Sequence, residues 1–256
     1  MNLTSSPSKY LQKSRSELNQ LVRGVPIQCI VRQKANNGFQ REDIQVQGSR
    51  VGILDANNRV RDEYETSEVF NEEASNSAIF NRCFPPYLRA LVEGVNVSVF
   101  MYGATGTGKS HTAEGQGADT GFVTLIADNL FNVLEEKRYQ VPSFQFGVKI
   151  RHMQILDEEV TDLLQPGGSP TFIKEHIRVD EWEGPYMQGV QWIPVPSASQ
   201  LNDFFRGGLR NKTQRSNEFG RMRDKAAVLF QIEVTQNMLH GSSGEGQVIV
   251  SRVNVL

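Results

Sequence analysis

The segment from Gly103 to Ser110 constrains the fold of this chain more than any other stretch. It reads GATGTGKS and fits the pattern G-x-x-x-x-G-K-[ST] without a gap. Glycines at this spacing let successive backbone N–H groups turn inward around a phosphate, and a helix that starts at the lysine adds its positive N-terminal end. The motif therefore predicts a strand before the loop, a helix after it, and phosphate binding between them.

The side chains at the end of this loop are predicted to have different ligands. Lys109 is long enough to reach the β- and γ-phosphate oxygens of a nucleotide, and the Ser110 hydroxyl is a ligand for Mg²⁺. His111 follows in the first turn of the expected helix, where a helix-surface position is the simplest interpretation. The predicted phosphate-binding residues are Gly103, Ala104, Thr105, Gly106, Thr107, Gly108, Lys109, Ser110 and His111.

Strand and helix patterns alternate on both sides of the loop. The unbroken apolar run VSVFMY before it is typical of a strand buried on both faces. Elsewhere, apolar residues alternate as in strands or recur at helical spacing, and Pro85 and Pro86 interrupt one helical pattern. The expected strands are 26–33, 44–46, 51–54, 97–102, 146–150, 226–234 and 247–256, and the expected helices are 75–94, a segment from 109, 125–134 and 201–209. This order predicts a three-layer α/β domain.

Composition narrows the class of protein. A net charge of −2 and a pI of about 6.1 do not indicate a nucleic-acid-binding or membrane protein. No apolar run approaches the ~20 residues that span a bilayer. Cys29 and Cys83 fit no metal spacing and no disulfide framework, which favours free thiols in the reducing cytoplasm. The polar residues 1–24 predict a flexible head before a single domain at 25–256.

The flanks of the loop resemble a known family. The segment VFMYGATGTGKSHTAEG at 99–115 is similar to the phosphate loop of kinesin motor domains, where Y-G-Q-T-G-x-G-K-[ST]-x-T-M-x-G is typical. Further segments resemble kinesin landmarks in order: YETSEVFNEEAS at 64–75, LVEGVNVSVFMYG at 91–103, MQILDEEVTDLL at 153–164 and GPYMQGV at 184–190. The resemblance covers about residues 25–256. It implies a doubly wound P-loop NTPase-type sheet with helices on both faces, ATP and Mg²⁺ as ligands, microtubules as partner, and a place on the cytoskeleton.

The expected adenine side departs from the family pattern. Kinesins follow their first strand with R-x-R-P, whose arginine and proline pack against the base, whereas this chain reads Arg32-Gln33-Lys34-Ala35. Lysine does not stack on a base as the planar guanidinium of arginine does. The resemblance therefore assigns Arg32 and Lys34 to the adenine side, with weakened affinity for the base.

A second departure lies at switch I, the kinesin motif N-x-x-S-S-R-S-H. A count without gaps from Gly189 places this motif on GRMRDKAA at 220–227. Asp224 and Ala226 then replace the two hydroxyls that would contact Mg²⁺, the γ-phosphate and water. Hydrolysis of this kind depends on placing water and neutralising charge on the γ-phosphoryl group. We therefore expect impaired hydrolysis and a degenerate switch I at Gly220, Arg223, Asp224, Lys225 and Ala226.

The last residues, VNVL, resemble the kinesin strand that continues into D-L-A-G-S-E, the switch II segment. On this resemblance we expect the chain to be the N-terminal part of a motor domain that stops before switch II. The basic stretch at 206–225 holds seven positive and two negative residues. It fits either a contact for an acidic partner such as tubulin or a solvated loop whose arginines pair with nearby acids. The candidate contact residues are Lys174, Arg178, Arg210, Lys212 and Arg215.

Three functions stay open from the sequence. The first is a divergent kinesin-like domain that binds Mg²⁺-ATP and microtubules but hydrolyses ATP poorly. The second is an active ATP-driven microtubule motor, and the third is a non-catalytic scaffold with a vestigial nucleotide site. Nucleic acid is disfavoured as a partner, because the basic stretch lacks interleaved aromatic residues apart from Phe219.

Overall fold

The computed structural model describes residues 27–34, 44–156, 159–165, 171–172, 177–180, 184–218, 226–239 and 246–256. The expected head at 1–24 lies outside these residues, and so do Lys174, Gly220, Arg223, Asp224 and Lys225. Arg215 lies within a described helix, but its side chain is outside the described part of the structure.

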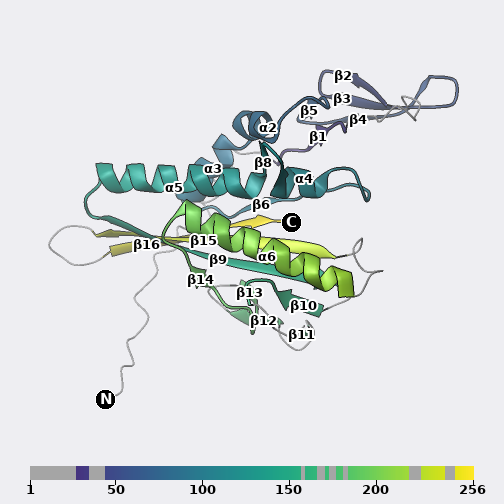
Figure 1. Ribbon diagram of the computed structural model, residues 1–256. Coiled ribbons are helices and arrows are strands. Elements are labelled where there is room, and N and C mark those ends of the chain that lie inside the picture. The colour runs from purple at the N-terminus through teal and green to yellow at the C-terminus, as the bar shows by residue number, and fades with distance from the viewer. Residues whose placement is uncertain are drawn as a thin grey trace, which may run out of the picture.

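A seven-stranded mixed sheet forms the centre of the fold (Figure 1). The strand order is β11-β10-β9-β15-β16-β6, with β14 pairing to β9. Strands β16 and β6 run parallel, and the other pairs are antiparallel. The strands are β6 (Val97–Val99), β9 (Phe144–Leu156), β10 (Glu159–Asp162), β11 (Thr171–Phe172), β14 (Ile193–Pro194), β15 (Ala227–Leu239) and β16 (Gly246–Val255).

The described helices are α2 (Asn76–Cys83), α3 (Pro85–Val92), α4 (Lys109–Glu114), α5 (Phe122–Gln140) and α6 (Ala198–Glu218). The Ser75 hydroxyl caps α2 by accepting a hydrogen bond from the Ala78 N–H at 3.1 Å. Pro85 and Pro86 open α3, because the first turn of a helix does not need their missing N–H groups. The prolines therefore divide the predicted helix at 75–94 into two.

One apolar core joins four of these helices to one face of the sheet. Strand β15 alternates, so Phe230, Ile232 and Val234 point to the same side and are buried. They share a core cluster with apolar residues of α2, α3, α5 and α6, among them Ile126 and Leu201. This mixed sheet with packed helices confirms the expected P-loop NTPase-type α/β fold, although these four helices of the described residues share one face of the sheet and not both.

The other face of the sheet is charged. Buried Glu233 accepts from Lys149 at 3.0 Å and from Arg252 at 2.9 Å. The guanidinium of Arg151 stacks 4.1 Å from the ring centre of Trp192. No helix of the described residues contributes to these contacts, so this face keeps its charges by pairing them within the sheet.

The strand before the phosphate loop is less buried than predicted. Val97 in β6 is buried, but Ser98 is exposed and the side chain of Tyr102 is fully exposed. Burial of 97–102 on both faces was therefore wrong. One side of the apolar run packs on the core through Val97, Val99 and Met101, whereas Phe100 and Tyr102 lie at the surface.

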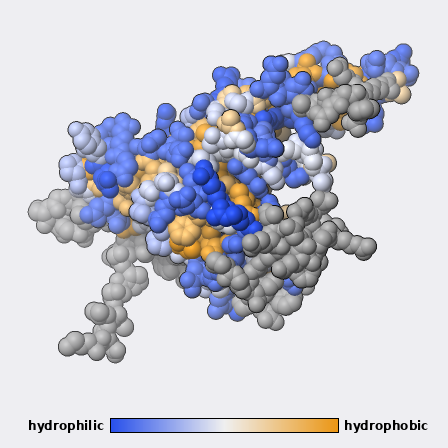
Figure 2. All heavy atoms as spheres, in the orientation of Figure 1, coloured by the Kyte–Doolittle hydropathy of each residue, from blue (hydrophilic) through white to orange (hydrophobic). Residues whose placement is uncertain are grey.

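Small sheets surround the core. They are β1 (Ile30–Arg32) with β5 (Glu68–Phe70), β2 (Ile44–Gln47) with β3 (Arg50–Leu54) and β4 (Val60–Glu65), β7 (Gly115–Gln116) with β8 (Asp119–Thr120), and β12 (Ile177–Asp180) with β13 (Gly184–Met187). The β2-β3-β4 sheet projects from the body (Figure 1). Apolar side chains such as Ile44 and Tyr64 are exposed on it, and Figure 2 shows orange patches there among hydrophilic residues. No helix in the described part of the chain is long and apolar enough to cross a bilayer.

Candidate phosphate-binding site

The loop at 103–108 lies between β6, which ends at Val99, and α4, which starts at Lys109. Gly106 and Gly108 adopt φ angles of 80° and 100°, a region that other residues rarely enter. A β-carbon at either position would meet no heavy atom within 4 Å, so these glycines are required by the backbone conformation and not by lack of space. The sequence motif and the local geometry therefore agree.

Two lysines from distant parts of the chain converge on this loop. Lys109 donates from Nζ to the carbonyl oxygens of Gly103 and Ala104, both at 2.9 Å. Lys34, which follows β1, donates from Nζ to the Gly106 carbonyl oxygen at 2.6 Å. Two ammonium groups beside a loop of backbone amides form a positive environment that suits the phosphates of a nucleotide.

Polar contacts, and not apolar packing, hold helix α4. None of its six residues is buried. Thr112 accepts from Arg32 Nη1 at 3.0 Å, and the His111 carbonyl accepts from Asn76 Nδ2 at 2.9 Å. At its end, Glu114 pairs with Lys212 at 2.9 Å. The position of the helix that carries Lys109 and Ser110 therefore depends on hydrogen bonds and ion pairs.

Arg32 is an anchor beneath this helix. Its guanidinium donates to the Asn76 side chain, to Thr112 and to the Ala74 carbonyl oxygen, and lies 3.7 Å from Asp119. Asn76 is fully buried, and its backbone N–H donates to Asp119 at 2.9 Å. Sequence reasoning missed this network because its members lie 35 or more positions apart along the chain. The adenine-side role of Arg32 stays a prediction.

His111 lies half-buried in α4, and its Nε2 is 3.3 Å from Asp119 Oδ2. The carboxylate of Asp119 thus faces His111, Arg32 and the first N–H of α2 at once. No motif marks Asp119 in the sequence. Its role follows only from the β7-β8 hairpin, which was not predicted and which folds residues 115–120 back against α4.

The donor set around Ser110 fits Mg²⁺ only together with a phosphate ligand. Ser110 is exposed in the first turn of α4. Among the described residues, no group of three or more His, Cys, Asp or Glu is arranged to hold a metal ion. Mg²⁺ commonly takes few protein ligands and completes its shell with water and substrate phosphates. A single hydroxyl at this position is consistent with that mode.

The candidate residues for an acidic-partner contact that the structure describes differ in exposure and in ion pairing. Lys212 is paired with Glu114 inside the chain. Arg210 is exposed on α6, and Arg178 is exposed in β12. Ala226, the described member of the switch I set, is half-buried directly before β15. Lys212 lies in helix α6 and not in the solvated loop considered from the sequence, although its pairing with an acid inside the chain agrees with that alternative.

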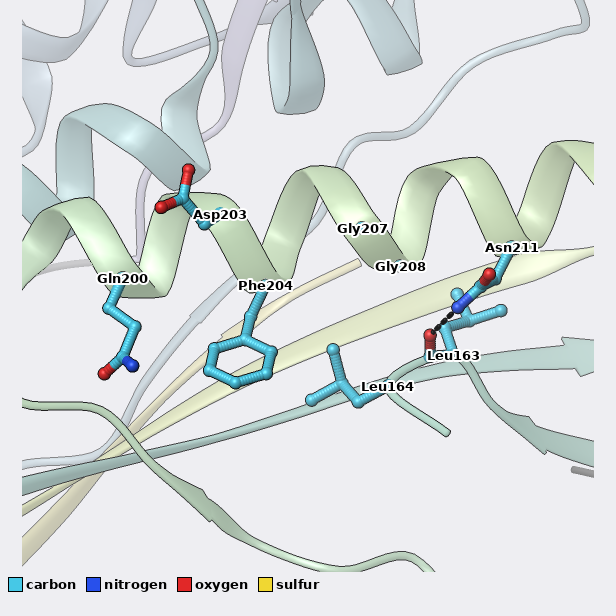
Figure 3. Close-up of a pocket in the computed structure, with 8 residues that line it drawn as sticks. All are labelled: Leu163, Leu164, Gln200, Asp203, Phe204, Gly207, Gly208 and Asn211. Carbon is cyan, nitrogen blue, oxygen red and sulfur yellow. Dashed lines mark hydrogen bonds between the residues drawn. The ribbon is translucent and has the colours of Figure 1, made fainter. Parts of the chain in front are cut away.

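A separate hollow lies along α6 (Figure 3). Its volume is about 410 Å³, and it is lined by Leu163, Leu164, Gln200, Asp203, Phe204, Gly207, Gly208 and Asn211. Asn211 closes one side by donating to the Leu163 carbonyl oxygen at 2.6 Å, the dashed line in Figure 3. None of its lining residues belongs to the loop at 103–110, so this hollow is distinct from the phosphate-binding site.

Comparison with known proteins finds kinesins as relatives of this chain. The family model for the kinesin motor domain matches residues 28–256. Kinesin-like protein KIF18B of Homo sapiens is 34% identical over 168 residues, which cover 66% of this chain and 19% of that protein. Kinesin-like protein KIN-7M, chloroplastic, of Arabidopsis thaliana is 27% identical over 208 residues, 79% of this chain and 19% of that protein. The chain thus spans about a fifth of the length of these relatives.

Two solved structures share the fold. One, described as the structure of a fast kinesin, has a TM-score of 0.76 at 20% identity and covers 90% of this chain and 64% of its own. The other is a KIF14 dimer with AMP-PNP in complex with a microtubule, with a TM-score of 0.72 at 21% identity, covering 88% of this chain and 66% of its own.

Proposed function

This chain belongs to the kinesin motor domain family, and on that premise we propose that it binds Mg²⁺-ATP through residues 103–110 and associates with microtubules, with impaired ATP hydrolysis. The convergence of Lys109 and Lys34 on the loop carries the nucleotide-binding part. Both ammonium groups already contact loop carbonyl oxygens, so exchanging those contacts for phosphate oxygens requires only local movement.

The loop residues have distinct roles in this proposal. Backbone N–H groups of 103–108 orient the phosphates, Lys109 neutralises their charge, and Ser110 ligates Mg²⁺. Bound Mg²⁺ would neutralise further charge on the β- and γ-phosphates. Lys34 donates to Gly106 at the edge of the loop, so in this proposal it would contact the phosphate or ribose end of the nucleotide and not the adenine side expected from the sequence.

Impaired hydrolysis is proposed from the sequence of the switch I region. The segment FGRMRDKAA at 219–227 contains no serine or threonine. Family hydroxyls at this place orient water and contact Mg²⁺, whereas Asp224 would add a negative charge near the γ-phosphate. The chain would therefore hold ATP without completing the hydrolytic step efficiently.

Microtubule association is proposed from family membership and from the microtubule complex of the KIF14 neighbour. Arg178 and Arg210 are exposed cations that suit the acidic surface of tubulin. The proposed place of action is therefore the cytoskeleton, in the cytoplasm.

Steady-state ATP turnover, with and without microtubules, tests the proposal together with microtubule co-sedimentation. We expect co-sedimentation with slow turnover that microtubules stimulate little. Strong stimulation by microtubules would instead establish an active motor. Unchanged cellular function after Lys109→Ala, with normal folding, would favour the scaffold with a vestigial site.

A further inference from the structure

Helix α4 is short and unusually dependent on its neighbours. It contains six residues, and none of them is buried. A six-residue helix has little intrinsic stability in water. Lys109 and Ser110 stand at its start, so any tilt of this helix moves both residues relative to a bound phosphate.

Glu114 at the other end of α4 is held by one long-range ion pair. Its Oε1 lies 2.9 Å from Lys212 Nζ, and the two residues are 98 positions apart. A carboxylate at a helix C-terminus is unfavourable beside the negative end of the helix dipole, and a neighbouring cation offsets that cost. Both side chains are 25% exposed, which reduces solvent screening relative to a fully exposed pair.

Lys212 projects from a helix that is firmly seated. Leu201 and Phe205 of α6 are buried in the main core. Asn202 donates to Asp128 of α5 at 3.2 Å, and Asn211, next to Lys212, donates to the Leu163 carbonyl oxygen at 2.6 Å. The pair therefore joins a well-anchored helix to a weakly anchored one.

We propose that Lys212 is a positioning residue for the nucleotide site. Through Glu114 it fixes α4 against α6, keeps Lys109 and Ser110 in register with the phosphates, and slows nucleotide release. The inference rests on the proposed nucleotide binding and adds a role within the chain for a cation that the sequence suggested as a contact for an acidic partner.

Release of a fluorescent ADP analogue, chased with excess ATP in a stopped-flow experiment, measures this role. Lys212→Met and Glu114→Gln should each speed release about two- to fivefold, the range expected for a partly exposed pair. Lys212→Arg should keep the wild-type rate. Arg206→Met is the matched control, because Arg206 is an exposed cation on the same helix, and it should also leave the rate unchanged.

The double variants separate the pair from either residue alone. Exchange of the charges, Lys212→Glu with Glu114→Lys, should restore a slow release rate. If the exchanged protein does not fold, the Lys212→Met/Glu114→Gln variant replaces it and should release no faster than either single variant. Unchanged release in both single variants, or additive effects in the double variant, would overturn the proposal while nucleotide binding stood. A wild-type protein that binds no nucleotide would overturn the proposed function itself, and this inference with it.

Discussion

The imidazole of His152 in β9 packs directly against the backbone of Gly208 in α6. A β-carbon on Gly208 would overlap the ring. The ring also stacks 5.3 Å from Phe205 and meets Phe230 edge-on at 5.1 Å, measured between centroids. His152 is fully buried, and neither ring nitrogen has a hydrogen-bond partner among the described residues. Helix α6 therefore approaches the sheet closely at Gly208.

The close approach predicts opposite effects for two adjacent glycines. Gly208→Ala should lower the free energy of unfolding by about 1–3 kcal/mol, because its methyl group would displace the His152 ring. Gly207→Ala is the matched control. Its β-carbon would meet only the end of Arg210 at 3.7 Å, so the gain in helix propensity should raise stability by about 0.5–1 kcal/mol. Denaturant unfolding measures both, and equal effects would refute the packing at Gly208.

His152 predicts a loss of stability in acid. Burial, assisted by the positive charge of Lys212, lowers the pKa of His152 from 6.5 to about 3. The unfolded chain takes up a proton near pH 6.5, and the folded protein resists it until much lower pH. The contribution of neutral His152 to the free energy of unfolding should therefore be fully present above pH 6.5. It should be lost as pH drops toward 3, by at most roughly 1.4 kcal/mol per pH unit.

The variant His152→Met isolates this contribution, because methionine is uncharged and fills irregular space. Denaturant unfolding of both proteins across that pH window gives the comparison. The variant should show a shallower decline in acid, whatever its stability at neutral pH. Parallel curves for the two proteins would show that His152 does not titrate as its burial implies.

The anchoring role of Arg32 predicts that lysine cannot replace it. A single ammonium cannot reach Asn76, Thr112 and Ala74 together, so Arg32→Lys should cost about 1–3 kcal/mol of unfolding free energy. Arg82→Lys is the control, since Arg82 is 68% exposed and pairs with Glu68 at the surface; it should change stability by less than about 0.5 kcal/mol. Wild-type stability with weakened nucleotide affinity would mean that Arg32 serves the base alone.

Sequence patterns predicted elements whose burial is periodic. Leu125, Ile126 and Leu130 marked α5, and the alternation around Phe230 marked β15, because each packs one apolar side against the core. The strand β4 was missed. Its sequence VRDEYE is largely exposed and shows no apolar alternation, so only pairing with β3 reveals it.

The phosphate loop was recognisable because its backbone geometry demands glycine at fixed positions, as at Gly106 and Gly108. The contacts that hold the loop and α4 in place could not be recognised from the sequence. Asp119, Asn76 and Lys212 reach α4 from three other elements, and polar contacts between distant residues leave no periodic trace in a sequence. Short motifs predict local backbone conformation, whereas the long-range contacts around a site are seen only in the folded structure.

Equilibrium titration with a fluorescent ATP analogue and Mg²⁺ tests the central claim most directly. The wild-type protein should bind the analogue, and Lys109→Ala should weaken binding at least about tenfold, equivalent to 1.4 kcal/mol, without loss of folding. Lys137→Ala, in the last turn of α5, should bind like wild type. Equal affinity of the wild-type and Lys109→Ala proteins, or no binding by the wild type, would contradict nucleotide binding by the loop at 103–110.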